Sequence, residues 1–427
     1  MSEPFSPGDE ARFFALFTPY FDLEKQTAQA HTAQHYSLER MAELARLAGN
    51  PERALRIVHV AGTKGKGSTC FFLDALLRAA GRSCGVFTSP HLLSVRERFQ
   101  AHGRPVAYGP LLAAAGRLVA AIRAAGLTPT LFEIMTVLAL QLVREARCEW
   151  CVFEAGIGGL LDSTNYVPRP ECCVITAISF DHTQLLGDTI AAIAAQKAGI
   201  LKPGVPAVLG RQPYPEAETV VAEAARRLGC GLRTADQERP LDAWPAVLAL
   251  PDFLQENFRT ALAVLDVLGI RAEPARFELP PLPGRFQLLR RTPPVVIDAA
   301  HNADSARRLA AALAAAFPGV RFTVVLGVVQ GKDVAGIFRE LQPVAAEFVL
   351  THPRNPGKGS ELPALQRLAA AAGSPHRTLP ELVRAEQLPG GAALLFTGSF
   401  FTALIGAELF GAAAPATAMV AKVRPAG

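Results

Sequence analysis

A glycine-rich segment with two lysines and a serine carries the strongest chemical signal in the sequence. Residues 62–69 read Gly-Thr-Lys-Gly-Lys-Gly-Ser-Thr and follow the apolar run 56–60. Glycines let backbone N–H groups approach a phosphate, a helix N-terminus adds partial positive charge, and lysine and serine side chains contact phosphate oxygens and Mg²⁺. The strict phosphate-loop pattern is not met, because Val60 stands at its first glycine and an extra glycine separates the second lysine from the serine. A plain glycine-rich turn is the alternative, but the strand pattern before the loop and the helix pattern after it favour ATP binding. The residues expected to bind ATP here are Gly62, Thr63, Lys64, Gly65, Lys66, Gly67 and Ser68.

Polar side chains follow two other apolar runs in the same half of the chain. Glu154 ends the run 150–154, and Asp181 and His182 come shortly after the run 173–176. In a parallel sheet, the residues just beyond the carboxyl ends of the strands line the ligand crevice. A carboxylate oxygen suits Mg²⁺, so Glu154 is a candidate metal ligand, with a turn-forming acid as the alternative. A lone histidine is more often structural, but sharing this edge with the phosphate loop favours a place for His182 in the site.

A lysine inside a helical pattern is harder to interpret. Lys197 lies in the predicted helix 190–201, which Asp188 or Thr189 would cap. A surface position is the default for such a lysine, and the residue pattern alone leaves both a surface and a site position open.

The second half of the chain offers its own polar cluster. Asp298 and His301 follow the apolar run 295–298, and Arg285 precedes it in a Pro-Gly-Arg turn. These residues are candidates for additional nucleotide contacts, because they too would stand at the end of a strand.

Apolar runs alternate with helical patterns in both halves, which predicts mostly parallel sheets with helices on both faces. The expected strands cover residues 56–60, 150–154, 173–176, 207–209, 295–298, 322–326, 348–350 and 394–397, and the clearest helices cover 68–80, 109–125, 132–146 and 303–316. The proline-rich passage 277–294 separates the two halves. We therefore expect an α/β protein with a phosphate-loop ATPase domain over residues 1–290 and a smaller Rossmann-like domain over residues 291–427.

The composition excludes several classes of protein. The net charge of +5 is mild for 427 residues, and the basic residues are scattered, which argues against a nucleic-acid-binding surface. The N-terminus lacks a secretory signal and no apolar stretch suits a membrane span, so we expect a cytoplasmic protein without membrane contact. The spacing of Cys148 and Cys151 and the pair Cys172-Cys173 could suggest zinc, but these cysteines lie in apolar strand patterns and are interpreted as small hydrophobic residues.

The ordered set of motifs resembles the folylpolyglutamate synthase and dihydrofolate synthase family, within the Mur ligase superfamily. The resemblance runs from about Tyr36 to Ile405, and although each motif is weak alone, the ordered set is highly specific. It rests on the loop 62–68, Ser89-Pro-His-Leu92 with Arg96-Glu-Arg98, Phe132-Glu133, the segment 154–165, Asp181-His-Thr with Gly187-Asp188, Lys197-Ala-Gly-Ile200, Pro283-Gly-Arg285, Asp298-Ala-Ala-His-Asn302 and Thr397-Gly-Ser399.

The resemblance implies a ligase that phosphorylates a folate-type carboxylate with ATP and lets the amino group of L-glutamate attack the acyl phosphate. The acceptor would be a reduced folate, dihydropteroate or both, and the enzyme would act as a monomer. The resemblance implies Mg²⁺ on Ser68, Glu154 and His182, carbamylation of Lys197 by CO₂, and K⁺ as a further cation. By the same resemblance, the catalytic residues would be Lys66, Lys197 and His182, the further ATP contacts Asn257, Arg285, Asp298 and His301, and the acceptor contacts Ser89, His91, Phe132 and Asp162.

The sequence departs from the family pattern at a few positions. Lys64 stands where asparagine is common, Leu160 replaces a common arginine, and Ala299 replaces a glycine, while the glutamine expected near Asn257 is displaced by one. Leu160 is the change expected to affect the acceptor side.

Two other functions compete with a folate ligase. A cell-wall Mur ligase would need an additional N-terminal domain, for which the loop at residue 62 leaves no room. A nucleotide-dependent switch without ligase chemistry would not account for the histidine, the helical lysine and a second α/β domain. Whether both acceptors are used stays open, because Phe132-Glu133 resembles bifunctional members whereas Lys64 and Ser89-Pro-His resemble dedicated polyglutamylating ones.

Overall fold

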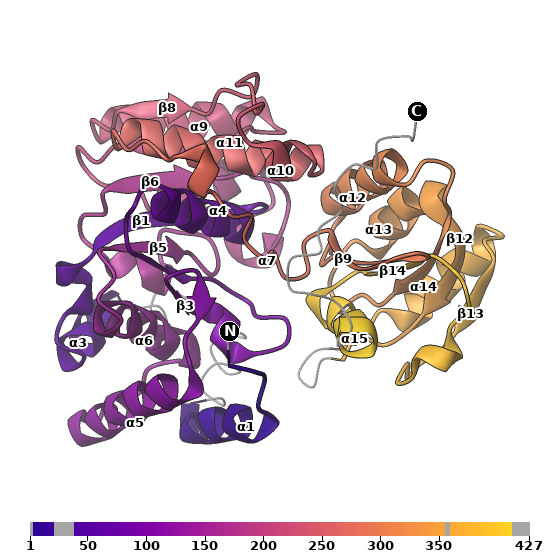
Figure 1. Cartoon of the computed structure of the whole chain (residues 1–427), viewed down its shortest axis with the longest axis horizontal. Helices are drawn as coiled ribbons and strands as arrows, with labels where there is room; N and C mark the ends of the chain where they lie inside the picture. Colours follow the sequence, from indigo (N-terminus) through magenta and orange to yellow (C-terminus); the bar gives the residue numbers. More distant parts are fainter. Residues whose placement is uncertain (1–2, 21–37, 355–358, 412–427) are drawn as a thin grey trace. The chain divides into compact units, whose positions relative to one another are not determined.

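The computed structural model describes residues 3–20, 38–354 and 359–411, which form two compact α/β units. The first unit comprises residues 1–243 and 256–280, and the second comprises residues 244–255 and 281–427. Figure 1 labels the elements of each unit along the chain. The predicted boundary at 290/291 falls inside strand β9 (Gln287–Arg291), which pairs antiparallel with β10 (Pro294–Ile297) and so belongs to the second sheet.

The first unit is built on an eight-stranded sheet in the order β4-β3-β2-β5-β1-β6-β7-β8. All neighbours are parallel except the pairs β2–β3 and β3–β4. The strands are β1 (Arg56–Ala61), β2 (Cys84–Phe87), β3 (Phe99–Ala101), β4 (Arg104–Pro105), β5 (Trp150–Glu154), β6 (Cys172–Ile175), β7 (Ala207–Leu209) and β8 (Leu232–Thr234). The chain leaves β1 toward β2 on one side and reaches β6 on the other, so the carboxyl end of β1 is a topological switch point, where α/β proteins bind ligands.

The described helices that accompany this sheet include those predicted over 68–80, 109–125 and 132–146, with bounds shifted by at most two residues. They are α1 (Pro7–Leu16), α3 (Leu38–Leu47), α4 (Lys66–Ala79), α5 (Tyr108–Ala125), α6 (Leu131–Glu145), α7 (Thr183–Leu186), α8 (Ile190–Ala198), α9 (Pro215–Arg227) and α11 (Asp252–Val267), the last of which begins in residues of the second unit. Thr189 caps α8 by accepting from the N–H of Ala192, as predicted, but the helix ends at Ala198 rather than near residue 201.

One face of the first sheet is covered by two hydrophobic clusters. The first gathers side chains of α1, α3, α5 and α6 against Ile57, Phe87 and Phe153. The second gathers side chains of α8 and α9 against Ala61 and Cys173. Because alternate residues of a strand point to the same face, the face of β1 that carries Ile57 and Ala61 meets both clusters in turn.

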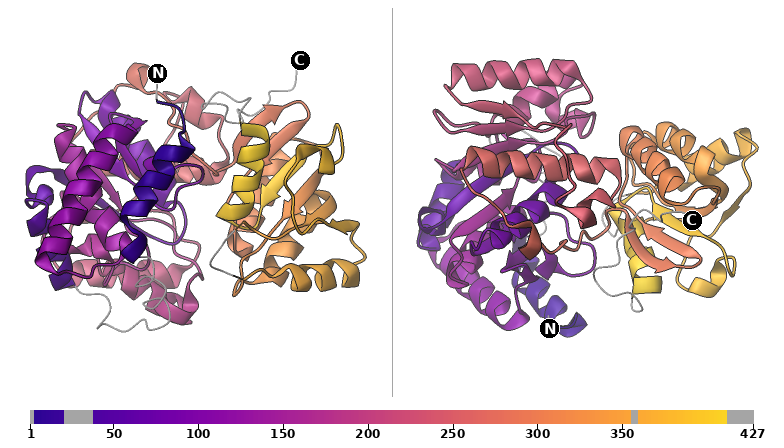
Figure 2. Two further views of the ribbon diagram at one scale, coloured as in Figure 1. Left: turned by 90° about the horizontal axis from the view of Figure 1, so that it is seen from below. Right: turned by 45° about the horizontal axis from the view of Figure 1, so that its top comes forward.

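The second unit carries a six-stranded sheet in the order β13-β12-β11-β14-β10-β9, with only β9 antiparallel. Its further strands are β11 (Phe322–Leu326), β12 (Ala345–Leu350), β13 (His376–Thr378) and β14 (Leu394–Thr397). Its helices are α10 (Pro245–Leu248), α12 (Ala303–Ala316), α13 (Val334–Leu341), α14 (Leu362–Ala371) and α15 (Phe400–Phe410). Figure 2 shows α15 against the strands of this sheet. The arrangement confirms the predicted α/β class, with one mostly parallel sheet in each half.

Candidate functional site

The loop between β1 and α4 has the backbone geometry of a phosphate-binding loop. Thr63 and Lys64 both donate their N–H groups to the carbonyl of Ala177, at 2.9 and 3.0 Å, which ties the loop to the segment after β6. Gly65 has φ of 87°, and a Cβ there would lie 2.3 Å from Oδ1 of Asn257. Glycine is therefore required at position 65 both for its conformation and for the close approach of Asn257, one of the predicted nucleotide contacts.

Two lysine amines donate to the same backbone oxygen at the start of this loop. Lys66 donates from Nζ to the carbonyl oxygen of Gly62 at 3.2 Å, and Lys197 donates to the same oxygen at 2.9 Å. Lys197 is only 3 % exposed, so the structure places this helical lysine inside the unit rather than on its surface. Burial, followed by the nearby positive charges of Lys66 and Lys64, lowers the pKa of Lys197 to about 7. An appreciable fraction of this amine is therefore neutral and nucleophilic near neutral pH.

Glu154 lies against the first turn of α4. A Cβ at Gly67 would be 3.5 Å from Oε2 of Glu154, and the same carboxylate oxygen accepts the N–H of Ser89 at 2.9 Å. Both Glu154 and Ser68 are buried. Their carboxylate and hydroxyl oxygens are ligands that suit Mg²⁺, and the helix N-terminus beside them suits the phosphate it would accompany.

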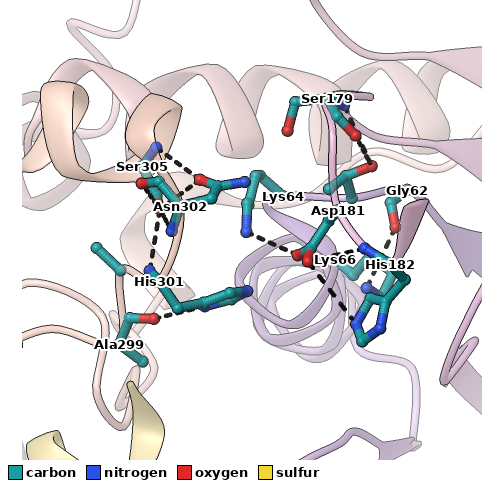
Figure 3. A network of polar contacts seen from close by, with 12 residues as sticks. Gly62, Lys64, Lys66, Ser179, Asp181, His182, Ala299, His301, Asn302 and Ser305 are labelled. Atoms are coloured by element: carbon teal, nitrogen blue, oxygen red, sulfur yellow. Dashed lines mark hydrogen bonds and ion pairs between the residues drawn. The ribbon is translucent and has the colours of Figure 1, made fainter. Parts of the chain in front are cut away.

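His182 occupies the segment that follows β6 and is more exposed. Its φ of 52° is unusual for a residue with a side chain, and its N–H is accepted by Oδ1 of Asp181 at 3.1 Å. The other carboxylate oxygen of Asp181 pairs with Nζ of Lys64 at 3.1 Å. Figure 3 shows this group beside Gly62 and Lys66. Across the described ranges, no cluster of three His, Cys, Asp or Glu side chains is arranged to hold a metal ion, and the predicted Mg²⁺ set contains only two such residues, Glu154 and His182.

The loop after β2 carries two predicted acceptor contacts, Ser89 and His91. His91 accepts at Nδ1 from Nε of Arg98 at 2.8 Å, and burial together with the charge of Arg98 lowers the pKa of His91 to about 3. The carboxylate of Glu97 accepts the N–H groups of residues 92, 93 and 94, at 2.7, 2.8 and 3.0 Å, and so fixes the loop from inside. Sequence reasoning noted Glu97 only as part of a motif and missed Glu10, whose carboxylate accepts from the N–H of residue 95 at 2.6 Å.

Phe132 and Asp162 come together around a glycine of the loop after β5. A Cβ at Gly156 would lie 2.5 Å from Cζ of Phe132 and 3.3 Å from Oδ2 of Asp162, so only glycine leaves room for both. Asp162 is buried, and burial raises its pKa although several groups hydrogen-bond to it. Leu160, in the same loop, is 46 % exposed. Phe132 of α6 and the loop after β5 therefore bring together a flat ring, a carboxylate oxygen and an apolar side chain.

In the second unit, Asp298 organises the turn after β10. Its two carboxylate oxygens accept the N–H groups of Phe286 and Ala300, at 2.7 and 2.8 Å. His301 contacts the carbonyl of Ala299 through Nδ1 at 2.8 Å, and Asn302 caps α12 (Figure 3). The guanidinium of Arg285 lies 4.4 Å from the ring centroid of Phe400. The predicted nucleotide contacts of this half are thus gathered at the carboxyl end of β10 and the turn before β9.

The cysteines behave as the apolar strand patterns indicated. All seven have free thiols, and Cys148, Cys151, Cys172 and Cys173 are buried in or beside strands of the first sheet.

No described helix combines the length and apolar character needed to span a bilayer.

Comparisons with known proteins give two family matches and close structural relatives. The Mur ligase middle domain matches residues 60–209, and the Mur ligase glutamate ligase domain matches residues 284–400. The dihydrofolate synthase/folylpolyglutamate synthase of Bacillus subtilis is 33% identical over 341 residues, covering 72% of this chain and 79% of the relative. Folylpolyglutamate synthase of Mycobacterium tuberculosis, solved with ADP and AMPPCP, superimposes with a TM-score of 0.79 at 31% identity, over 93% of this chain and 99% of that one. The bifunctional enzyme of Yersinia pestis, solved with AMPPNP and a Mn ion, gives a TM-score of 0.76 at 31% identity, over 87% of this chain and 92% of that one.

Proposed function

This chain belongs to the Mur ligase family, within its folylpolyglutamate synthase and dihydrofolate synthase members, and we propose that it joins L-glutamate to the carboxylate of a folate-type acceptor with ATP. The observation that carries the proposal is the meeting of Lys66 and Lys197 at the carbonyl of Gly62, beside the N-terminus of α4. This arrangement places the charge of Lys66 and the helix N-terminus where the phosphates of a nucleotide would lie, with Lys197 beside them. The names of the relatives supply the acceptor class.

Activation of the acceptor is the first chemical task. A carboxylate is a poor electrophile because its leaving group would be an oxide, so its oxygen attacks the γ-phosphorus of ATP, ADP leaves, and an acyl phosphate forms. The amino group of glutamate then attacks the acyl carbon, and inorganic phosphate leaves. Phosphoryl transfer depends mainly on positioning and charge neutralisation. The N–H groups of the loop and the amine of Lys66 supply both without forming covalent bonds.

A divalent cation would complete the charge neutralisation. Ser68, Glu154 and His182 would hold Mg²⁺, which when bound spreads the negative charge of the transferring phosphate. The hydroxyl and carboxylate oxygens of Ser68 and Glu154 fit this ion, and Mn in the Yersinia pestis relative supports a divalent metal. K⁺ is a further cation that this proposal includes at the site.

Lys197 would act as a carbamate. Its lowered pKa leaves a neutral amine that attacks CO₂, losing one proton and gaining a carboxylate on nitrogen. The product is an anion beside Lys66, so it would anchor that lysine and the metal instead of repelling them. Asn257 and the second-unit residues Arg285, Asp298 and His301 would contact the nucleotide, and Ser89, His91, Phe132 and Asp162 would contact the acceptor.

The enzyme is further proposed to work as a cytoplasmic monomer, with ATP, L-glutamate and a folate or pteroate as its partners. Light scattering of the purified protein in the presence of Mg-ATP would give the mass of the active species. A mass near 45.4 kDa supports the monomer, and a stable larger species would contradict it.

The decisive test is glutamate-dependent ADP release with Mg-ATP, with dihydropteroate in one assay and tetrahydrofolate in another, followed by the mass of the product. Turnover in both assays identifies a bifunctional enzyme, and turnover in one identifies a dedicated member. Absence of turnover in both assays would contradict the folate acceptor, and the exposed Leu160 would then be the first position to examine for a different acceptor.

A further inference from the structure

A histidine buried inside the first sheet is not used by the proposed chemistry. His59 lies in β1, three residues before the phosphate loop, and its side chain is completely inaccessible to solvent. Its strand neighbours are Phe153 of β5, whose ring centroid is 6.1 Å from the imidazole, and Cys173 of β6. Burying a polar ring at such a position costs free energy unless the ring is hydrogen-bonded.

The hydrogen-bond partner of His59 lies in the short 3₁₀ helix that Asp162 caps. Nε2 of His59 lies 2.8 Å from Oγ1 of Thr164, in the helix Ser163–Tyr166. Oγ1 of Thr164 in turn lies 2.6 Å from Oδ1 of Asp162, to which it donates. The side chains of His59, Thr164 and Asp162 therefore form a continuous series of hydrogen bonds, here called the relay, from the middle of the sheet to the loop after β5.

The number of protons available determines which atoms donate in the hydrogen bonds of this relay. A hydroxyl has one hydrogen, and that of Thr164 is used by the short bond to Asp162, so its oxygen must accept from His59. The imidazole then carries its proton on Nε2, and Nδ1, which has no hydrogen-bond partner, is left as a bare acceptor. The opposite direction would leave a buried N–H unpaired at Nδ1 and would require a proton on Asp162.

The surroundings of the His59 imidazole favour its neutral form, which can donate through Nε2. Burial, together with the positive charge of Lys202, lowers the pKa of His59 to about 3, so the ring stays neutral over the physiological range. The amine of Lys202 itself donates to the carbonyl of Asn165, at 3.1 Å. At the other end, the positive charge of Lys66 favours the ionised form of Asp162 and so its role as an acceptor.

Asp162 is left with capacity for one more donor. Its Oδ1 accepts from the hydroxyl and the N–H of Thr164, at 2.6 and 3.0 Å, whereas Oδ2 accepts only the N–H of Ile157, at 2.8 Å. The same Oδ2 lies close to the ring of Phe132, since a Cβ at Gly156 would be 3.3 Å from Oδ2 and 2.5 Å from Cζ of that ring. An aromatic ring beside a carboxylate oxygen suits a flat heteroaromatic group that presents an N–H donor at its edge.

We propose that His59 is a positioning residue that, through the hydroxyl of Thr164, holds Asp162 as an oriented hydrogen-bond acceptor for the N–H edge of the pteridine ring of the acceptor. The proposal rests on the proposed function for the identity of that ring. His59 would not contact the substrate. By donating to Oγ1 of Thr164 it directs the Thr164 proton to Oδ1 of Asp162, which leaves Oδ2, beside the ring of Phe132, as the oxygen with capacity for a further donor.

A purely structural role would look different. Asp162 also caps the 3₁₀ helix through the N–H of Thr164, and this cap does not need the hydroxyl or the imidazole. If capping were the whole role, removing the Thr164 hydroxyl would reduce the free energy of unfolding without changing the affinity for one substrate relative to the others.

The kinetic test uses matched variants of the full chain. Thr164→Val and His59→Leu should each raise the KM for the pteridine acceptor about tenfold, as expected for a lost charge-assisted hydrogen bond, with the KM for ATP unchanged within about twofold. Thr164→Ser keeps the hydroxyl and His59→Gln keeps a donor, so both should behave like the wild type. Because the two groups act in series, the double variant should be no worse than Thr164→Val alone.

Thr260→Val is the control for deleting a buried threonine hydroxyl, since that hydroxyl only donates to the carbonyl of Glu256 in its own helix. If Thr164→Val or His59→Leu raised the KM for all substrates equally, or if their effects were additive in the double variant, the proposed role of the relay would be overturned.

A second measurement does not depend on the substrate. In ¹⁵N-histidine-labelled wild-type protein, with His59→Leu as the assignment control, the His59 imidazole should be the neutral Nε2–H tautomer from pH 5 to 8. The Nδ1–H tautomer, or a charged ring in that range, would overturn the proposal whatever the acceptor is. If the tautomer is as expected but neither pteridine acceptor supports ADP release, the relay holds and the proposed acceptor class fails.

Discussion

The amines of Lys66 and Lys197 both donate to the carbonyl oxygen of Gly62, at 3.2 and 2.9 Å, although the two lysines are 131 positions apart in the sequence. Two like charges at one acceptor repel each other, and part of this repulsion appears in the lowered pKa of Lys197. A site that places a second lysine beside its phosphate-binding lysine is unfavourable unless the second becomes neutral or anionic. The relationship therefore supports the carbamate proposed for Lys197.

Replacing Lys197 should remove most of the activity. Lys197→Ala should lower kcat by at least about 100-fold, with partial recovery when short carboxylates are added, because they replace the anionic oxygens of a carbamate. ADP release measures the effect. Lys202→Ala is the matched control, since the pKa of Lys202 is also lowered, but this lysine is only partly buried and donates to the carbonyl of Asn165. Full activity of Lys197→Ala would remove the carbamate from the mechanism.

The same lysine should make folding stability depend on pH. In CO₂-free buffer the unfolded state binds a proton at Lys197 up to its ordinary pKa of 10.5, whereas the folded state loses it near 7. The unfolded state therefore binds more protons between pH 7 and 10.5, and the contribution of Lys197 to stability becomes more favourable as pH rises through that window. Denaturant unfolding at pH 7 and 9.5 should show a smaller rise for Lys197→Met than for the wild type, and identical rises would contradict the shift.

Gly65→Ala should weaken nucleotide binding strongly. A Cβ at this position meets Oδ1 of Asn257 at 2.3 Å, and φ of 87° is strained for alanine, so we expect a KM for ATP raised by more than about tenfold. Gly116→Ala in α5 is the control, because nothing lies within 4 Å of its Cβ; it should stabilise the helix by about 0.5–1 kcal/mol and leave the KM unchanged. An unchanged KM for Gly65→Ala would show that the loop does not carry ATP.

Glu154→Gln should reveal a metal role. The amide keeps an acceptor for the N–H of Ser89 but loses the negative charge, so activity should fall at least about tenfold at low Mg²⁺ and recover in part at high Mg²⁺. A titration of activity against Mg²⁺ at saturating ATP measures the shift. A loss that Mg²⁺ does not change would favour a structural role for Glu154.

Asp298→Asn should loosen the turn after β10. Both carboxylate oxygens of Asp298 accept backbone N–H groups, and an amide can keep only one of these bonds, so we expect the free energy of unfolding to fall by about 1–3 kcal/mol. The KM for ATP should rise while the KM for the acceptor stays unchanged. A variant with lowered stability and wild-type kinetics would limit Asp298 to a structural role.

The sequence by itself determined the local elements and the chemistry they could support. Strand β5 at 150–154, helix α12 at 303–316, strand β11 at 322–326 and the Thr189 cap follow from periodicity and capping rules, because these depend on residues near one another in the chain. The phosphate loop could be predicted for the same reason, since its glycines, lysine and serine are contiguous.

Only the tertiary structure decided which distant residues meet. The burial of Lys197, the approach of Asn257 to Gly65 and the chain from His59 to Asp162 all join segments more than 100 residues apart. A histidine within an apolar strand pattern was the only signal for His59, and it does not name a partner. The pairing of β9 with β10 likewise depends on a neighbouring strand and not on its own sequence. Side-chain proximity and pKa depend on packing across the whole unit, which no local pattern specifies.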